Sequence, residues 1–381
     1  MMRLFHISDL HLGKKLCEAP LIADQRHMLA QLCAQVRAHT PHAVLIAGDV
    51  YDKTIPSAEA VGLLDEFLTD LAALGTQVVI ISGNHDSAER LAFGARLLAP
   101  QKVHISPVYD QAHAAITPVR LSDEYGEVAL WPVPFLKPAH VRAVMPDAKA
   151  ETYTQAMAAV LAALPLDASQ RNVLLCHQYI TGGERAESEE ISVGGLDNVD
   201  AAVFDAFDYV ALGHLHRAQS VGRPTVRYAG SPLKYSFSEA KDTKSASLVT
   251  LGRKGEVSIQ ALPLTPLRAL RELRGTYAAL TLRENYQHTT RDDYLHITLT
   301  DEQDIPDAFG KLQSIYPNLL KLDFDNARTR GAGRPLTSAP ENRKPIDMVS
   351  QFYEAQYGAP LSDAQRGYAL ALLERVWEGN A

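Results

Sequence analysis

The sequence predicts a layered α/β fold, with a large N-terminal domain followed by a smaller one. Short runs rich in Val, Ile and Leu alternate with amphipathic helical stretches through the first half of the chain, a rhythm typical of βαβ units. Clusters of polar residues recur where these runs stop. The chain has 381 residues, of which 46% are hydrophobic, so it can bury a large core.

The first half is organised as strands that lead into helices. The run "RLFHIS" precedes a helical stretch at 21–39, "AVLIAGD" precedes 57–74, and "QVVIIS" precedes 88–98. In such units, ligands gather at the carboxyl ends of the strands. Later strand candidates have few helices between them, so the last of them should add to a sheet as antiparallel strands; the candidates are 127–133, 172–177, 209–214, 225–230, 245–251 and 257–262.

The two prolines of "LPLTPLR" (262–268) predict a domain boundary. A smaller α/β part follows, with strands near 268–274, 294–300 and 319–325 and a helix near 305–316. The segment 327–345 contains five basic residues and one acidic residue, which is typical of a flexible linker. We therefore predict domains at 1–262 and 263–326, a basic linker at 327–345, and C-terminal helices at 346–381.

Composition restricts the class of protein. The net charge of −8 argues against a protein that coats nucleic acid through its overall charge. A local basic surface on one face is still compatible with this net charge. The three cysteines form no CxxC pair, which favours a reducing compartment without disulfides or structural zinc. No apolar stretch is long enough to span a bilayer. These features predict a cytoplasmic protein.

Polar clusters stand at the ends of five predicted strands. Each has an ordinary structural interpretation by itself, as a turn, a helix cap or a surface histidine. Together, in one order and at one sheet edge, they predict a metal site. The clusters are Asp9 and His11 in "SDLH", Asp49 and Asp52 in "GDVYD", Asn84, His85 and Asp86 in "GNHD", His177 in "NVLLCH", and His214 and His216 in "GHLH".

The ligand types indicate the chemistry. Carboxylate, imidazole and amide oxygen without thiolate suit Mn²⁺, Fe²⁺ or Zn²⁺ better than Cu(I) or an iron–sulfur cluster. There are enough donors for two ions bridged by a carboxylate, and such a pair activates water and neutralises a phosphate. The residues therefore predict phosphoester hydrolysis.

The order DxH, GDxxD, GNHD, H and GHxH resembles the calcineurin-like metallophosphoesterase superfamily over residues 3–230. The stretches "SDLHLGK", "GDVYDKTIPS", "GNHDSAERL", "PVPFLKP", "YVALGHLHRAQ" and "RYAGSPLKYSFSE" are similar to the SbcD nuclease subunits of bacterial SbcCD complexes. The resemblance implies a metallophosphoesterase β-sandwich flanked by helices, a capping domain at 263–326 that shapes entry of DNA ends, and C-terminal helices that bind the SbcC ATPase coiled coil. It also implies that the "AGSPLKYSFSE" loop borders the active site, although the same residues are compatible with a simple turn.

Carried over to this sequence, the resemblance implies that Asp9, His11, Asp49 and His216 hold one metal ion. It implies that Asp49, Asn84, His177 and His214 hold the other, with Asp49 as the bridge. His85 would act as general acid or transition-state stabiliser. Some relatives carry a histidine where this chain has Asp52; here we predict that Asp52 hydrogen-bonds His85 and orients it, the alternative being a solvated turn residue. Asp86 is expected to support the site rather than to bind metal.

The resemblance also implies contacts with partners. DNA phosphates would meet Arg217, Arg268, Arg271 and Arg274, although exposed arginines on a solvated face explain the same pattern. The ATPase would bind apolar anchors on the terminal helices, which could equally pack on their own domain: Phe352, Tyr353, Leu370, Leu373 and Trp377. The helix at 21–39, with Ile22, Met28, Leu29, Leu32 and Val36, stands where SbcD-like subunits dimerise, but its pattern is that of an ordinary packed helix.

We therefore predict the nuclease subunit of an SbcCD-type complex, active in DNA repair, recombination and replication. It would cut phosphodiesters at double-strand ends and hairpins as an exonuclease and endonuclease, as a homodimer within a heterotetramer with the ATPase. Two Mn²⁺ ions are expected, with Mg²⁺, Fe²⁺ and Zn²⁺ as alternatives. The rival interpretations are a cyclic-nucleotide phosphodiesterase or a nucleotide or protein phosphatase on the same core, and a catalytically silent scaffold.

Overall fold

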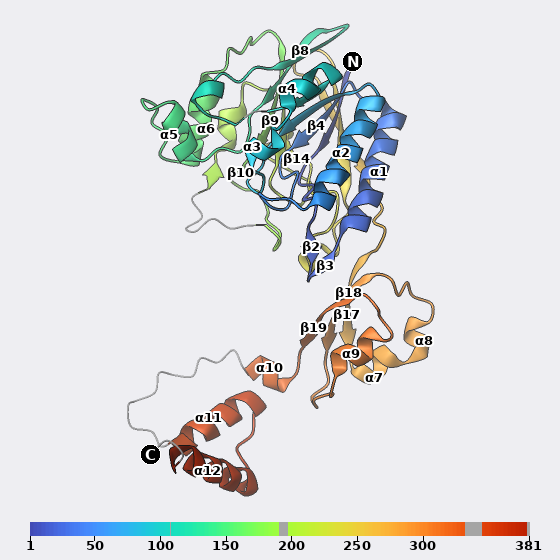
Figure 1. Cartoon of the computed structure of the whole chain (residues 1–381), viewed down its shortest axis with the longest axis vertical. Helices are drawn as coiled ribbons and strands as arrows, with labels where there is room; N and C mark the ends of the chain where they lie inside the picture. The colour runs from blue at the N-terminus through green and yellow to red at the C-terminus, as the bar shows by residue number, and fades with distance from the viewer. Residues whose placement is uncertain (107, 190–196, 332–344, 379–381) are drawn as a thin grey trace. The chain divides into compact units, whose positions relative to one another are not determined.

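The structure, a computed structural model, describes residues 1–106, 108–189, 197–331 and 345–378, and it divides into two compact units, Met1–Ala269 and Leu270–Ala381 (Figure 1). No helix in these ranges has both the length and the apolar character that crossing a membrane requires.

The first sheet of the N-terminal unit has the strand order β16-β15-β1-β4-β5-β6. Its first four strands in the sequence run parallel, and β15 and β16 join antiparallel beside β1, as the sequence predicts. The strands are Met2–Ile7 (β1), Ala43–Ala47 (β4), Gln77–Ile81 (β5), Val103–Ile105 (β6), Ser245–Leu251 (β15) and Val257–Pro263 (β16).

The second sheet has the order β13-β14-β12-β9-β8-β7. Its central strands β8, β9, β12 and β14 are parallel, whereas the edge strands β7 and β13 are antiparallel to their neighbours. The strands are Val119–Asp123 (β7), Gly126–Pro132 (β8), Arg171–His177 (β9), Tyr209–Gly213 (β12), Gln219–Val221 (β13) and Arg223–Tyr228 (β14).

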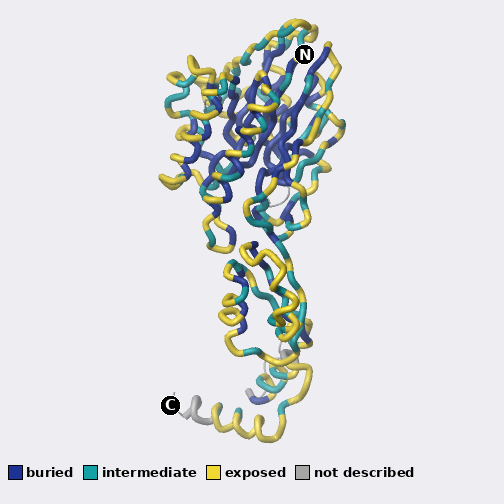
Figure 2. The backbone as a smooth tube through the Cα atoms, turned by 90° about the vertical axis from the view of Figure 1, so that its right-hand side faces the viewer, coloured by how far each residue is buried: buried dark blue, intermediate teal, exposed yellow. Residues whose placement is uncertain are grey.

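The core of this unit lies between the two sheets, and alternation along each strand builds it. Leu4 and Leu45 of the first sheet pack with Leu130 and Val173 of the second in one buried cluster. The alternate positions face outward and are also buried, because helices cover both outer faces. In Figure 1, α1 and α2 cover one side of the sandwich, and α5 and α6 cover the other. The buried dark-blue backbone of Figure 2 is concentrated in these strands.

The covering helices begin at recognisable caps. Helix α2 (Ala58–Ala73) begins after Ser57, whose side chain accepts from the backbone N–H of Ala60. Helix α6 (Tyr153–Ala162) begins with a capping box formed by Thr152 and Gln155. The other two covering helices are α1 (Ile22–His39) and α5 (Pro138–Val144).

The helix predicted at 88–98 is two short helices instead of one. Helix α3 spans Ala88–Leu91 and helix α4 spans Ala95–Leu98. Gly94 between them has φ = 75°, a left-handed conformation that ends helical hydrogen bonding and that glycine adopts without strain.

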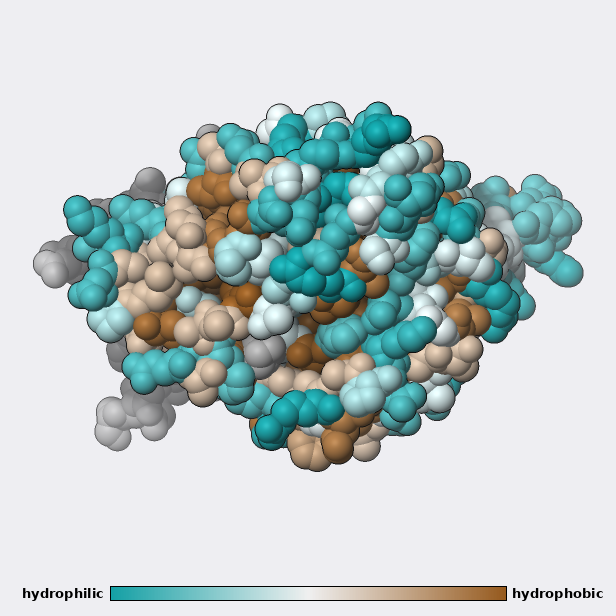
Figure 3. Space-filling view, turned by 90° about the horizontal axis from the view of Figure 1, so that it is seen from above, coloured by the Kyte–Doolittle hydropathy of each residue, from teal (hydrophilic) through white to brown (hydrophobic). Residues whose placement is uncertain are grey.

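Short elements complete the N-terminal unit. They are the strands Lys15–Leu16 (β2), Ala19–Pro20 (β3), Tyr179–Ile180 (β10) and Asn198–Val199 (β11), and the 3₁₀ helices Ala99–Gln101 (η1), Gln111–His113 (η2), Ala201–Phe204 (η3) and Phe237–Glu239 (η4). On the face drawn in Figure 3, hydrophobic residues lie in small patches between hydrophilic ones.

The C-terminal unit is built on a parallel three-stranded sheet, β17-β18-β19, whose buried core includes Ile297 and Leu312. Its elements are Leu270–Gly275 (β17), Tyr277–Thr281 (α7), Arg283–Tyr286 (α8), Tyr294–Leu299 (β18), Ala308–Gln313 (α9), Leu319–Phe324 (β19), Ala327–Gly331 (α10), Pro345–Tyr357 (α11) and Asp363–Glu378 (α12). The segment predicted to be a linker thus begins with a short helix, and its residues 332–344 lie outside the described ranges.

Candidate metal centre

Polar side chains from five strand ends meet at one edge of the two-sheet sandwich. The parallel strands of both sheets direct their carboxyl ends to this edge, as in other open α/β sheets. Asp9 and His11 follow β1, Asp49 follows β4, Asn84 and His85 follow β5, His177 ends β9, and His214 and His216 follow β12. The structure therefore brings all seven predicted metal ligands and His85 together.

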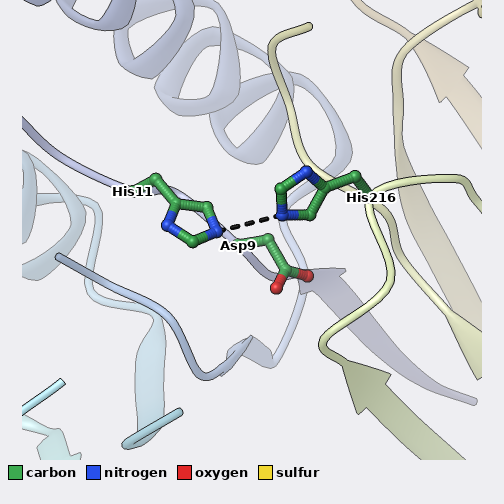
Figure 4. A group of neighbouring side chains, drawn as sticks. All are labelled: Asp9, His11 and His216. Atoms are coloured by element: carbon green, nitrogen blue, oxygen red, sulfur yellow. Dashed lines mark hydrogen bonds between the residues drawn. The ribbon is translucent and has the colours of Figure 1, made fainter. Parts of the chain in front are cut away.

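Asp9, His11 and His216 form the first group of donors (Figure 4), with one ligand atom from each lying within 4.8 Å of the others. Nε2 of His11 lies 3.0 Å from Nε2 of His216. A metal–nitrogen bond of about 2.1 Å and a ligand–metal–ligand angle of about 90° place two donor nitrogens about 3.0 Å apart. The two imidazoles therefore have the separation of ligands that share one cation.

The second group surrounds Asn84. Its side-chain oxygen lies 3.0 Å from Nε2 of His177 and 3.0 Å from Nδ1 of His214. On the other side of the His177 ring, Nδ1 lies 2.9 Å from the carbonyl oxygen of Ala47. Because a carbonyl only accepts, Nδ1 carries a hydrogen and Nε2 faces the group as the ligand atom.

Asp49 lies between the two groups. One of its oxygens, Oδ2, is 3.6 Å from Nε2 of His11 in the first group and 3.4 Å from Nε2 of His177 in the second. A single carboxylate that reaches both groups is what a bridged pair of ions requires. The oxygen and nitrogen donors, without a thiolate, fit divalent ions such as Mn²⁺, Fe²⁺ or Zn²⁺.

The backbone at the centre is strained. Asp9, His11, Asp49 and His214 all have positive φ, at 54°, 42°, 49° and 106°. Non-glycine residues rarely adopt such angles, and where they do the strain often marks a functional site. The close approach of the loop after β5 to Asp49 requires a glycine, because a Cβ on Gly83 would lie 2.1 Å from Oδ1 of Asp49.

The carboxylates and imidazoles of the centre are electrostatically coupled. Burial disfavours a charge on Asp49, but His177 outweighs burial and leaves the pKa of Asp49 well below its usual range. Burial likewise opposes a charge on His177, yet the carboxylates of Asp49 and Asp9 raise its pKa to about 9. Burial lowers the pKa of His11 to about 4 and that of His214 well below its usual value. The last two rings are thus neutral at pH 7, the state in which imidazole binds a metal.

His85 lies beside the donors and contacts Asp52 as predicted, but through the backbone carbonyl of Asp52 and not through its carboxylate. Nδ1 of His85 lies 3.2 Å from the backbone carbonyl oxygen of Asp52, while Nε2 lies 3.9 Å from Oδ2 of Asp49. The Asp52 carboxylate instead accepts from Nζ of Lys14 at 2.7 Å and lies 3.6 Å from Nδ1 of His11. The side chain turns toward the His11 ring and the Lys14 ammonium because both stabilise its charge, and despite burial they hold the pKa of Asp52 well below the usual range.

This geometry predicts a mild effect for Asp52→Asn. The substitution keeps the backbone carbonyl that holds His85, and it weakens only the contacts with Lys14 and His11, so we expect turnover to fall by less than about tenfold. Steady-state kcat on a phosphodiester, measured together with metal stoichiometry, checks this. A loss of hundredfold or more with both ions retained would restore the carboxylate to the mechanism.

Asp86 supports the neighbouring loop and is not one of the grouped donors, in keeping with the supporting position that the sequence predicts. Its carboxylate accepts from the backbone N–H groups of Val50, Tyr51 and Gly83, at 3.1, 2.8 and 2.9 Å. These bonds tie the loop after β4 to the loop after β5.

Sequence reasoning missed several residues that surround the centre. Lys14 belongs to the stretch "SDLHLGK" and Glu239 to "SPLKYSFSE", but neither pattern assigns these two side chains a role. Ser188, which lies 2.7 Å from Nδ1 of His216, carried no signal at all. A single serine in a loop has no spacing or neighbour that would distinguish it before folding.

A cavity of about 1060 Å³ opens beside Asn84. Its lining includes three groups that can carry positive charge and three carboxylates: Arg90, Lys137, His140, Asp86, Glu89 and Asp110. It is large enough for a nucleotide-sized ligand.

The arginines predicted to contact DNA are all engaged in ion pairs within the chain. The pairs are Arg217 with Glu184 and Asp242, Arg268 with Asp24, Arg271 with Asp293, and Arg274 with Asp325. Contact with DNA by these residues stays a prediction.

The predicted anchors on the terminal helices are partly exposed. Phe352 is 55% exposed and Leu370 is 40% exposed, whereas Tyr353 and Leu373 are half-buried. The ring of Tyr353 stacks on that of Tyr357. Trp377 belongs to α12, but its side chain lies outside what the structure describes.

Comparisons with known proteins cover both units. The model of the calcineurin-like phosphoesterase family matches residues 2–218, and the SbcD_C model, described as the Type 5 capsule protein repressor C-terminal domain, matches residues 266–357. A curated protein from Staphylococcus epidermidis, named as the SbcD subunit of the nuclease SbcCD, is 33% identical over 373 residues, which is 96% of each chain. A solved structure of a dimetal phosphatase from Danio rerio is 12% identical, with a TM-score of 0.44, over 70% of this chain and 98% of its own.

Proposed function

The chain belongs to the SbcD nuclease family of the calcineurin-like phosphoesterases, and we propose that it hydrolyses DNA phosphodiesters at double-strand ends and hairpins. The observation that carries this proposal is the position of Asp49 between two groups of oxygen and nitrogen donors. That arrangement suits a two-metal hydrolase better than a mononuclear site. A role in DNA repair, recombination and replication follows from the family and is part of the proposal.

We assign one ion to Asp9, His11, Asp49 and His216, and the other to Asp49, Asn84, His177 and His214. Mn²⁺ is the proposed metal, since mixed imidazole, carboxylate and amide oxygen ligands suit it. When bound, the pair would supply a nucleophile at neutral pH and neutralise the phosphate.

His85 is the proposed acid. The carbonyl of Asp52 accepts from Nδ1 of His85, which leaves Nε2 to face the centre. The protonated ring would donate from Nε2 to the leaving oxygen, while Nδ1 keeps its hydrogen and donates it in a hydrogen bond to the carbonyl oxygen of Asp52. Only an imidazolium has a hydrogen on each ring nitrogen for these two hydrogen bonds. The bond from Nδ1 to the backbone of Asp52 orients the ring so that Nε2 is directed to the centre.

The substrate strand is proposed to lie along the cavity beside Asn84. Arg90 and Lys137 there have no carboxylate partner among the ion pairs of the described residues, so they are open to phosphate oxygens. The C-terminal unit would act as the capping domain that selects DNA ends.

A nuclease assay tests the proposal. Labelled hairpin DNA, blunt duplex, cyclic nucleotides and small phosphomonoesters are incubated with the full chain and Mn²⁺, with a chelator as control. We expect cleavage of hairpin and duplex ends that the chelator abolishes. Turnover of cyclic nucleotides or phosphomonoesters with none on DNA would replace the nuclease by the nucleotide-directed alternative.

The terminal helices are proposed to bind the coiled coil of an SbcC-type ATPase. Large apolar side chains stand exposed on them, including Phe352, Leu370 and Tyr368, the last at 66%, and such side chains are typical of helix-in-groove partners. We expect Phe352→Asp with Leu370→Asp to abolish co-purification with the ATPase while the isolated chain keeps its phosphodiesterase activity. Undiminished co-purification would place the ATPase elsewhere.

A homodimer is proposed through α3 and α4. Met28 and Leu32 of α1, which the resemblance places where subunits dimerise, are 2% and 0% exposed inside the unit, as in the alternative of an ordinary packed helix. Phe93 and Leu97, in contrast, are 86% and 82% exposed, and large exposed apolar residues mark interfaces. Light scattering should show a dimer for the wild type and a monomer for Leu97→Glu; a Leu97→Glu dimer would exclude this surface.

A further inference from the structure

The imidazole of His216 is held from behind by a chain of buried polar groups. Its Nδ1 lies 2.7 Å from Oγ of Ser188, and that hydroxyl lies 2.7 Å from Oε1 of Glu239. Glu239 is fully buried, and Nζ of Lys244 donates to its other oxygen at 2.5 Å. Lys244 also donates to the carbonyl oxygen of His216 at 2.8 Å, so the same cation holds the carboxylate and the backbone of the ligand.

The hydrogen bonds that connect His216, Ser188 and Glu239 can have only one donor–acceptor direction. The Glu239 carboxylate, paired with Lys244, only accepts, and the Ser188 hydroxyl has one hydrogen to donate. That hydrogen goes to Glu239, so the oxygen of Ser188 must accept from Nδ1–H of His216. The free lone pair of the ring is then on Nε2, the atom that lies 3.0 Å from Nε2 of His11.

The other side of the centre is supported differently. Nδ1 of His177 donates to the carbonyl oxygen of Ala47, a neutral backbone group. A carboxylate behind a ligand imidazole fixes its tautomer and increases its basicity, and loss of such a partner typically costs ten- to a hundredfold in metal affinity. The metal affinities of the two donor groups should therefore change unequally when the hydrogen bonds from His216 through Ser188 to Glu239 are removed.

We infer that Glu239, acting through Ser188, is a positioning residue that sets the metal affinity of the Asp9, His11 and His216 side without affecting the side at Asn84 and His177. This inference rests on the proposed metal pair. It also gives a physical reason for the last residue of "SPLKYSFSE", which the nuclease reaction itself does not use.

Calorimetric titration of the metal-free full chain with Mn²⁺ tests the inference. For Ser188→Ala and Glu239→Gln, we expect one of the two binding steps to weaken ten- to a hundredfold and the other to stay unchanged. Ser188→Thr, which keeps the hydroxyl, should restore the affinity. Ser236→Ala is the matched control, because its hydroxyl contacts that of Ser238 and is not part of the chain behind His216.

Thermal unfolding of the metal-free variants separates positioning from folding. If Glu239→Gln is unfolded because Lys244 has lost its carboxylate partner, the titration of Ser188→Ala by itself decides the inference. Two unaltered binding steps in Ser188→Ala, or equal weakening of both, would overturn the inference while the metal pair stands. A wild type that binds no divalent ion would overturn the proposed function as well.

Discussion

His85→Ala should lower turnover on DNA by about 10²–10⁴-fold, the usual contribution of a positioned proton donor, while both metal ions stay bound. The reason is geometric. Nε2 of His85 lies 3.9 Å from Oδ2 of Asp49, farther than that oxygen lies from His11 or His177, and Nδ1 is directed to the carbonyl of Asp52. One ligand atom each of His85, His11 and Asp49 lie within 4.8 Å of one another, so His85 borders the donors. It is the most distant of the three rings from Asp49, and we therefore assign it the proton and not a metal ion.

Two measurements distinguish loss of an acid from loss of metal. Single-turnover kinetics on a hairpin reports the chemical step, and Mn²⁺ stoichiometry reports the donors. A substrate with a better leaving group should recover much of the activity of His85→Ala, because it needs less protonation. Equal activity in mutant and wild type, or a fall in stoichiometry to one ion, would remove His85 from the proposed role.

Asp49→Asn should have a still broader effect, since Asp49 is the side chain common to both groups of donors. A single oxygen, Oδ2, reaches both groups, and an amide oxygen in its place carries no formal charge and binds two cations far more weakly than a carboxylate oxygen. We expect the stoichiometry to fall from two ions to one at most, and activity to fall by at least about 10³-fold, because a few kcal/mol of transition-state stabilisation is lost and each 1.4 kcal/mol is tenfold in rate.

Asp86→Asn is the matched control for this substitution. It removes a neighbouring buried carboxylate whose pKa is raised to about 6 by burial and by Asp49, but which accepts only backbone N–H groups in the structure. We expect two ions to bind to Asp86→Asn. If both variants lost the same number of ions, local negative charge, and not ligation by Asp49, would explain the effect.

The sequence predicted which polar side chains meet, because these side chains lie at the ends of strands. Periodicity located β1, β4, β5, β9 and β12, and the parallel rhythm required their carboxyl ends to share an edge. The spacing of Asp9 and His11, or of His214 and His216, is local and visible before folding.

The failures all involve side-chain direction. Asp52 has the expected position in the chain, but Lys14 and His11 attract its carboxylate away from His85. Helix α1 has an apolar face that a sequence cannot assign to a core or to a partner, and here Met28 and Leu32 face the core. Ser188 and Glu239 are separated by 51 residues and meet only through tertiary packing.

Anomalous diffraction from crystals grown with Mn²⁺, recorded on both sides of the manganese absorption edge, would show whether Asp49 bridges a pair of ions. We expect two peaks about 3.5–4 Å apart, with Asp49 between them, one against Asp9, His11 and His216 and the other against Asn84, His177 and His214. A single peak at this edge of the sandwich, or two peaks of which neither contacts Asp49, would contradict the bridged pair.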